Sequence, residues 1–153
     1  MISLIFLIAI TLLTVSSMRS SNINLRMAQN EESRVAADQA AQALADAIVS
    51  KPESTPVVGI SGYTVCTSGE YNCDRYDLAV TDSMLATAIN SNYISARVER
   101  TGTVFRPPPR IVESSIDKFS SASFRVTATY DRTADGLGYR QISEGVLVLV
   151  PKQ

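Results

Sequence analysis

Two cysteines, Cys66 and Cys73, are the residues of this chain whose type and spacing could most readily do chemistry. They enclose a short polar segment, TSGEYN, which has the composition of a loop. Beyond a membrane-spanning segment, an even pair at such short spacing predicts a disulfide formed in an oxidising compartment. Two free thiols in a cytosolic domain are the alternative. A ring this small restrains the unfolded chain by about 2–3 kcal/mol, so we expect it to shape a loop rather than hold the domain together.

A possible calcium loop lies nearer the C-terminus. Asp131, Thr133, Asp135 and Gly136 resemble the opening of such a loop, but Ile142 stands where its bidentate glutamate belongs. The turn-forming chemistry of Asp-Gly explains the same residues without an ion. We therefore expect no metal site and no cofactor.

The chain lacks the residues most often used in enzymatic catalysis. The 153 residues include no His, which removes the commonest acid/base at neutral pH and the His-dependent hydrolase triads. No nucleophile–base pair can be nominated, so we expect neither an enzyme nor a small-molecule substrate. The acids Asp74, Asp77 and Asp82 are interpreted as parts of a solvated loop. A net charge of -1 with scattered basic residues argues against nucleic-acid binding.

The elements that position these residues begin with an unbroken apolar stretch over 1–18. As a helix it would reach about 27 Å, close to the ~30 Å of a bilayer's hydrocarbon core. It is apolar on every face, so a small domain could hardly enclose it, and we interpret it as a membrane anchor. A cleaved signal peptide stays open because Thr14, Ser16 and Ser17 would allow cleavage, although no basic residue precedes the run. The side chains expected to pack in the membrane or a filament core are Ile2, Leu4, Ile5, Phe6, Leu7, Ile8, Ile10, Leu12, Leu13 and Val15.

The same helix is expected to continue far beyond the anchor. No Gly or Pro occurs before Pro52, so helix propensity is uninterrupted for about fifty residues. We expect residues 19–51 to form its amphipathic half. Within it, Ala37, Ala41, Leu44 and Ile48 follow one stripe at helical spacing and are predicted to pack on a sheet. A coiled coil is disfavoured because no heptad of large apolar residues is sustained.

Residues 52–153 are expected to form one small extracytoplasmic domain of the α+β class. A short strand over Tyr63–Val65 leads into the cysteine loop. Either Thr81 or Asp82 could cap a short helix that ends at Asn90.

Alternating side chains predict the longer strands of this domain. Ile94–Glu99 and Phe124–Tyr130 each place apolar residues at every second position. Between them, the consecutive prolines of 105–110 predict a rigid crossing loop, with a proline-rich recognition segment as the alternative. Asp131–Gly138 is expected to form a hairpin loop, and Tyr139–Val150 to return as the last strand.

Two details of that last strand are also predicted. Gly145 is expected to mark a β-bulge. Val146–Val150 is apolar on both faces, so we expect it to be central in the sheet or covered by helix. The domain would thus be a helix packed on an antiparallel sheet of three to four strands.

The first fifty residues resemble a known family. A Ser17–Arg19 junction, a Leu25–Ala28 block followed by Asn30, and an Ala-rich helix over 36–44 are similar to the N-terminal signature of PilX-type minor pilins of bacterial type IV pili. The end of the chain resembles that family less closely. The resemblance implies a type IV pilin-like fold.

Two features depart from the family pattern. The family begins with a short basic leader ending in Gly, and alignment on the junction places its mature start a few residues before Met1. Most pilins also carry a glutamate near the mature N-terminus, whereas no acid precedes Glu31 here. PilX-type subunits share this lack, which implies a position at or near the pilus tip.

The resemblance implies a non-enzymatic minor pilin that primes or caps filament assembly. Its partners would be other minor pilins, major pilin subunits and the pilus assembly machinery. It would sit in the inner membrane as a single-pass protein with a periplasmic domain, and then in the surface fibre. The positive-inside rule applied to Arg19 and Arg26 would instead place the domain in the cytoplasm, a conflict that a basic leader upstream would resolve. The alternatives are a type II secretion pseudopilin and a membrane-tethered ligand-binding or sensory domain.

Overall fold

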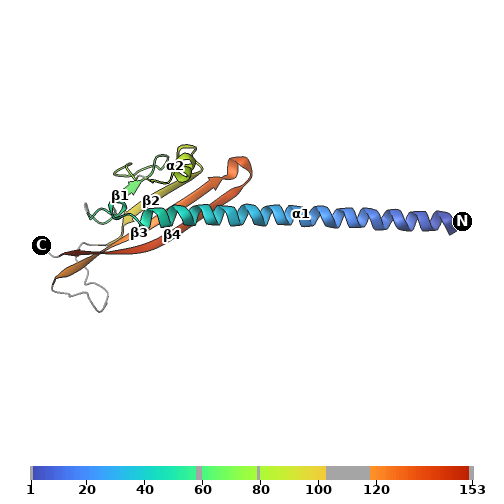
Figure 1. Ribbon diagram of the computed structural model, residues 1–153, viewed down its shortest axis with the longest axis horizontal. Helices are drawn as coiled ribbons and strands as arrows, with labels where there is room; N and C mark the ends of the chain where they lie inside the picture. The colour runs from blue at the N-terminus through green and yellow to red at the C-terminus, as the bar shows by residue number, and fades with distance from the viewer. Residues whose placement is uncertain (1, 58–59, 79, 103–117, 152–153) are drawn as a thin grey trace. The chain divides into compact units, whose positions relative to one another are not determined.

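The computed structural model describes residues 2–57, 60–78, 80–102 and 118–151. The chain divides into two compact units, Met1–Ala36 and Ala37–Gln153. Along the chain, the helices and strands are α1 (Ile2–Val49), a 3-10 turn (Pro52–Ser54), β1 (Thr64–Cys66), α2 (Ser83–Asn90), β2 (Ile94–Arg100), β3 (Phe119–Arg132), a second 3-10 turn (Thr133–Asp135) and β4 (Gly138–Pro151) (Figure 1).

The first unit contains residues of α1 only. The last turns of this helix, from Ala37 onward, belong to the second unit. The predicted long helix is confirmed, and it ends at Val49, close to where Pro52 was expected to stop it. Pro52 instead opens the first 3-10 turn, where a missing N–H costs nothing.

The second unit is an α+β domain, as predicted. Its four strands pair antiparallel in the order β1-β2-β3-β4, and residues 37–49 of α1 pack on one face of this sheet (Figure 1). Asp82 caps α2: its carboxylate accepts the N–H groups of Met84 at 2.8 Å and Leu85 at 3.1 Å. The prolines of 105–110 lie outside the described residues.

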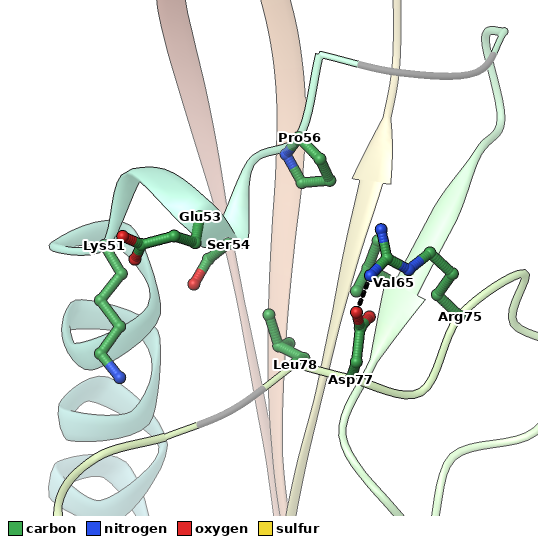
Figure 2. A pocket seen from close by; sticks show the side chains of 8 residues that line it. All are labelled: Lys51, Glu53, Ser54, Pro56, Val65, Arg75, Asp77 and Leu78. Atoms are coloured by element: carbon green, nitrogen blue, oxygen red, sulfur yellow. Dashed lines mark hydrogen bonds and ion pairs between the residues drawn. The ribbon is translucent and has the colours of Figure 1, made fainter.

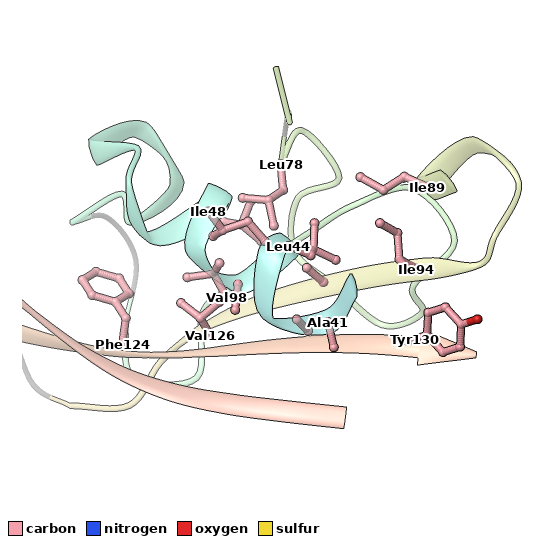
Figure 3. Close-up of a cluster of buried hydrophobic side chains, with 14 of the residues drawn as sticks. Ala41, Leu44, Ile48, Leu78, Ile89, Ile94, Val98, Phe124, Val126 and Tyr130 are labelled. Atoms are coloured by element: carbon pink, nitrogen blue, oxygen red, sulfur yellow. The ribbon is translucent and has the colours of Figure 1, made fainter. Parts of the chain in front are cut away.

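The core of the domain lies between the helix and the sheet. Leu44 and Ile48 point from α1 toward Val98 of β2 and Val126 of β3 (Figure 3). Small side chains on both sides, such as Ala41 and Ala128, are fully buried and allow the helix to approach the strands closely.

Two expectations about the C-terminal hairpin and one about β1 were wrong in detail. The β3–β4 register is constant from Phe119↔Pro151 to Arg132↔Gly138, with Gly145 directly opposite Arg125, so there is no bulge. The strands also extend further into the predicted loop, because Gly136 at φ 74° and Gly138 at φ 89° allow a tight reversal. At the other side of the sheet, β1 begins at Thr64 rather than Tyr63.

The expectation that Val146–Val150 is central or covered was also wrong. In the described part of the chain β4 borders only β3, and its residues alternate between half-buried and exposed. Leu147 and Leu149 remain 56% and 45% exposed. The helix covers a single face of the sheet, so side chains on the other face of this strand stay in solvent.

Candidate functional surfaces: the apolar helix and the disulfide loop

The first candidate surface is the apolar part of α1. All ten residues expected in a membrane or filament core are exposed, from 49% at Ile8 to 84% at Ile2. The helix is long and apolar enough to cross a membrane. Because these described side chains are apolar and exposed, the segment is a candidate membrane anchor and a candidate helix-packing surface.

Two threonine side chains within this apolar surface bond to their own helix. The Thr11 hydroxyl donates to the carbonyl of Ile8 at 2.8 Å, and the Thr14 hydroxyl donates to that of Ile10 at 2.6 Å. A hydroxyl satisfied in this way costs little in an apolar environment. The two threonines are therefore compatible with burial in lipid or among neighbouring helices.

The second part of the helix holds the domain. The structure places Ala37, Ala41, Leu44 and Ile48 in the core, at 4% exposure or less. Sequence reasoning missed Ala45, which is also fully buried. Ala45 lies four residues after Ala41 and next to Leu44, so it widens the packed stripe. This spacing from Ala41 is a signal that could have found it.

Polar contacts border this packed stripe and were not predicted. Asp38 forms an ion pair with Arg140 of β4, and one turn later Gln42 donates a hydrogen bond to Glu144 at 2.7 Å. The two helix residues are four apart, and so are their two strand partners. Matched spacing on two amphipathic elements is a signal that could have suggested the pairing, but sequence alone does not show which strand lies beside the helix.

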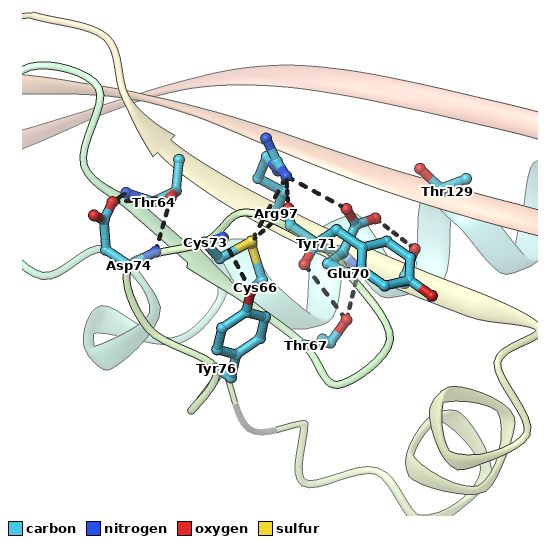
Figure 4. Close-up of polar contacts among 12 residues, drawn as sticks. Thr64, Cys66, Thr67, Glu70, Tyr71, Cys73, Asp74, Tyr76, Arg97 and Thr129 are labelled. Atoms are coloured by element: carbon cyan, nitrogen blue, oxygen red, sulfur yellow. Dashed lines mark hydrogen bonds and ion pairs between the residues drawn. A yellow bond between two sulfur atoms is a disulfide. The ribbon is translucent and has the colours of Figure 1, made fainter.

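The second candidate surface is the disulfide loop between β1 and β2 (Figure 4). Cys66 and Cys73 form the predicted disulfide, with their Cα atoms 6.2 Å apart. Arg97 of β2 lies opposite Cys66 in the register, and its guanidinium donates to the carbonyl of Tyr71 at 2.5 Å. The same guanidinium lies 3.7 Å from the carboxylate of Glu70. The loop is thus held to the sheet by a covalent bond and by one arginine.

Asp74 gives the loop a third attachment. Its carboxylate accepts the backbone N–H of Thr64 at 2.7 Å and the Thr64 hydroxyl at 3.0 Å. These two bonds, the backbone one first, lower the pKa of the Asp74 carboxyl because both favour the charged form. Asp74 lies in an exposed loop, as interpreted from the sequence, but its bonds to Thr64 were not predicted. Asp77 forms an ion pair with Arg75, and Asp82 is the helix cap described above.

Close backbone approach shapes the tip of the loop. Gly69 has a φ of +99°, and a Cβ at this position would lie 2.7 Å from the side-chain oxygen of Asn92. Tyr71 is 81% exposed and Tyr76 is 53% exposed. The result is a loop with several attachments that presents two tyrosines to solvent.

The acids of the hairpin segment that resembles a calcium loop form bonds within the turn. The Asp131 carboxylate accepts the Thr133 hydroxyl at 2.7 Å and the Thr133 N–H at 3.0 Å, and these bonds lower its pKa. Asp135 accepts a bond from Arg132 at 2.8 Å. Both carboxylates are therefore engaged within the turn. Among the described residues no cluster of three His, Cys, Asp or Glu side chains could hold a metal ion.

A cavity of about 320 Å³ lies beside the end of α1 (Figure 2). It is lined by Lys51, Glu53, Ser54, Pro56, Val65, Arg75, Asp77 and Leu78. The Arg75–Asp77 ion pair occupies one side of it. Its lining mixes charged side chains with the apolar side chains of Pro56, Val65 and Leu78.

Comparison of the chain with protein-family models, with curated proteins and with solved structures found no match.

Proposed function

We propose that this protein is a minor pilin, a structural subunit that enters a filament through α1. The observation that carries the proposal is that two parts of one uninterrupted helix have different surroundings. Residues 2–15 are apolar and exposed, whereas Ala37–Ile48 supply the core of the folded domain. Such a chain has an exposed apolar helical segment that is not part of the core of its folded domain.

The apolar segment 2–15 of α1 is compatible with two environments. In a bilayer, lipid tails would surround the apolar side chains of 2–15, and in a filament the helices of neighbouring subunits would replace the lipid. Both environments are apolar, so the transfer leaves no buried side chain newly exposed to water. The hydroxyl bonds of Thr11 and Thr14 to their own helix suit either state.

We also propose that the protein docks on sibling subunits through the disulfide loop. Three attachments hold the loop: the disulfide, Arg97 and Asp74. A surface that is fixed before binding loses little conformational entropy on association. The exposed rings of Tyr71 and Tyr76 would then be contact residues of this loop.

The test is a charge placed in the middle of the apolar segment. Ile8→Arg should reduce membrane insertion by about 2.5–3.5 kcal/mol and abolish filament incorporation. Leu25→Arg, a matched control on the same helix, lies past the apolar segment and should leave membrane insertion intact. Insertion is measured by carbonate extraction of membranes from cells that produce each variant.

The filament role needs a separate readout in the native bacterium. Deletion of the gene should reduce surface piliation and twitching, and wild type but not Ile8→Arg should restore both. Unchanged piliation in the deletion strain would refute the pilin proposal. A defect in protein secretion with normal pili would instead favour the pseudopilin alternative.

A further inference from the structure

The outer edge of β4 is long, regular and uncharged, which is unusual for an exposed strand. β4 spans fourteen residues, and within the described residues it pairs with β3 alone. A strand at the edge of a sheet presents a row of N–H and C=O groups that can pair with another chain.

The hydrogen-bond pattern shows which backbone groups face outward. The N–H of Thr101 donates to the carbonyl of Ser123, and the N–H of Asp131 donates to that of Tyr93, each at 2.9 Å. Odd-numbered residues of β3 therefore bond toward β2, and its even-numbered residues bond toward β4. Through the β3–β4 register, even-numbered residues of β4 bond back to β3. The backbone groups that face the open edge belong to Tyr139, Gln141, Ser143, Gly145, Leu147 and Leu149.

This edge lacks the features that usually prevent strand pairing. Natural edge strands are short, bulged, interrupted by proline or protected by outward charges. The β3–β4 register continues without a bulge, and Pro151 stands only at the last position. None of the six outward-bonding residues is charged. The exposed side chains of Leu147 and Leu149 lie along the same edge.

The charge distribution restricts what could bind there. The two charged residues of β4, Arg140 and Glu144, contact Asp38 and Gln42 of α1 within the same domain. From Gly145 to Pro151 the strand carries no charge. A charged partner strand would lose solvation beside this half without gaining an opposite charge. An uncharged strand would not.

The direction of the helix argues against a second copy of this chain. Asp38 contacts Arg140 and Gln42 contacts Glu144, so residues 38–42 of α1 run in the same direction as β4. An antiparallel pairing of two β4 strands would make the two copies of α1 residues 37–49 run in opposite directions. That arrangement does not suit two chains anchored by their N-terminal segments in one bilayer.

We propose that the open edge of β4 accepts an extended, uncharged segment of a partner protein as an additional antiparallel strand. Main-chain hydrogen bonds to the outward residues would supply affinity, and apolar side chains of the partner would cover Leu147 and Leu149. The proposal requires the chain to be anchored by α1 but not to enter a filament. The strand-pairing proposal can therefore fail while the pilin proposal stands, and the pilin proposal can fail while the strand-pairing proposal stands.

The experiment uses the full chain in detergent micelles and one synthetic probe. The probe is an N-acetylated, C-amidated peptide that alternates threonine and valine over seven residues. Hydrogen exchange of individual amides is followed by NMR with and without the peptide. Binding should slow exchange at Gln141, Ser143, Gly145 and Leu147 by about tenfold or more, and even-numbered amides of β4 should change little. A peptide with aspartate in place of valine is the matched control and should not bind.

Two variants test the edge itself. Ser143→Pro removes an outward donor without removing a bond to β3, and Leu147→Lys places a charge beside the partner. Each should weaken peptide binding about tenfold or more, while Tyr71→Lys in the disulfide loop should have no effect. Far-ultraviolet circular dichroism selects variants that remain folded.

Three results would overturn the proposal. The first is unchanged exchange of the outward amides at saturating peptide. The second is unaltered peptide binding in a folded Leu147→Lys variant. The third is protection that rises with protein concentration in the absence of peptide, which would assign the edge to a second copy.

Discussion

Replacing Leu44 by alanine tests how the long helix is joined to the domain. Leu44 is fully buried and packs between α1 and strands β2 and β3 (Figure 3). Leu→Ala changes at such sites cost about 2–5 kcal/mol, through lost transfer energy and the cavity left behind. The same core cluster includes Ala96 and Ala128, whose side chains are too short to fill the space. We therefore expect a value toward the upper end of that range, about 3–5 kcal/mol.

This loss corresponds to a fall in the unfolding midpoint of roughly 12–25 °C for a domain of this size. The full chain is unfolded in detergent micelles and followed by near-ultraviolet circular dichroism of its tyrosines, all of which lie after Pro52. This signal reports the domain and not the anchor, which micelles keep helical.

Val35→Ala is the matched control on the same helix. Val35 is 44% exposed and precedes the packed stripe, so its truncation should cost less than about 1 kcal/mol. If Leu44→Ala lowers the midpoint no more than Val35→Ala does, residues 37–49 do not form the core of the domain in solution. The argument for a helix divided between two tasks would then fail.

Three further changes test the loop and the border of the helix. Cys73→Ala should lower the free energy of unfolding by about 2–3 kcal/mol in urea titrations without reductant. Addition of reductant should lower the free energy of unfolding of the wild type to the value of the variant. The lowered pKa of the Asp74 carboxyl means that its bonds stabilise the fold fully above the ordinary pKa of 3.8 and are lost as pH falls through the lower, folded value. Asp74→Asn should therefore destabilise the domain near neutral pH and flatten the acid limb of its stability profile. Equal slopes for wild type and variant below pH 3.8 would contradict this reasoning. A double-mutant cycle with Asp38→Asn and Arg140→Gln should give a coupling below about 1 kcal/mol, because both side chains are partly exposed and salt screens them. A coupling of several kcal/mol would mean that the pair is desolvated in solution.

Local signals predicted most elements of the domain correctly. Pro52 limits α1 because its ring and missing N–H cannot continue a helix, whatever surrounds it. Asp82 begins α2 because its carboxylate satisfies N–H groups only two and three residues away. The alternation over Ile94–Glu99 predicted β2 because the side-chain period of a strand is a local property.

The errors arose where the outcome depends on distant residues. Gly145 permits a bulge, but the unbroken register with β3 left no extra residue to accommodate. Val146–Val150 has the composition of a buried strand, yet its exposure depends on which strands lie beside it and which face the helix covers. The bonds of Asp74 were not predicted because their partner, Thr64, is ten residues away and is brought near by the reversal of the disulfide loop.

The amino-acid sequence by itself determined the uninterrupted helix, its apolar first part and the pairing of the two cysteines. These depend on backbone propensity, on residue polarity and on a short loop, all of which act over a few residues. Only the tertiary structure decided that β4 borders the sheet, that Arg97 and Asp74 hold the disulfide loop, and that Asp38 and Gln42 meet β4. Those contacts join segments up to a hundred residues apart, and their formation depends on which faces pack together when the whole domain folds.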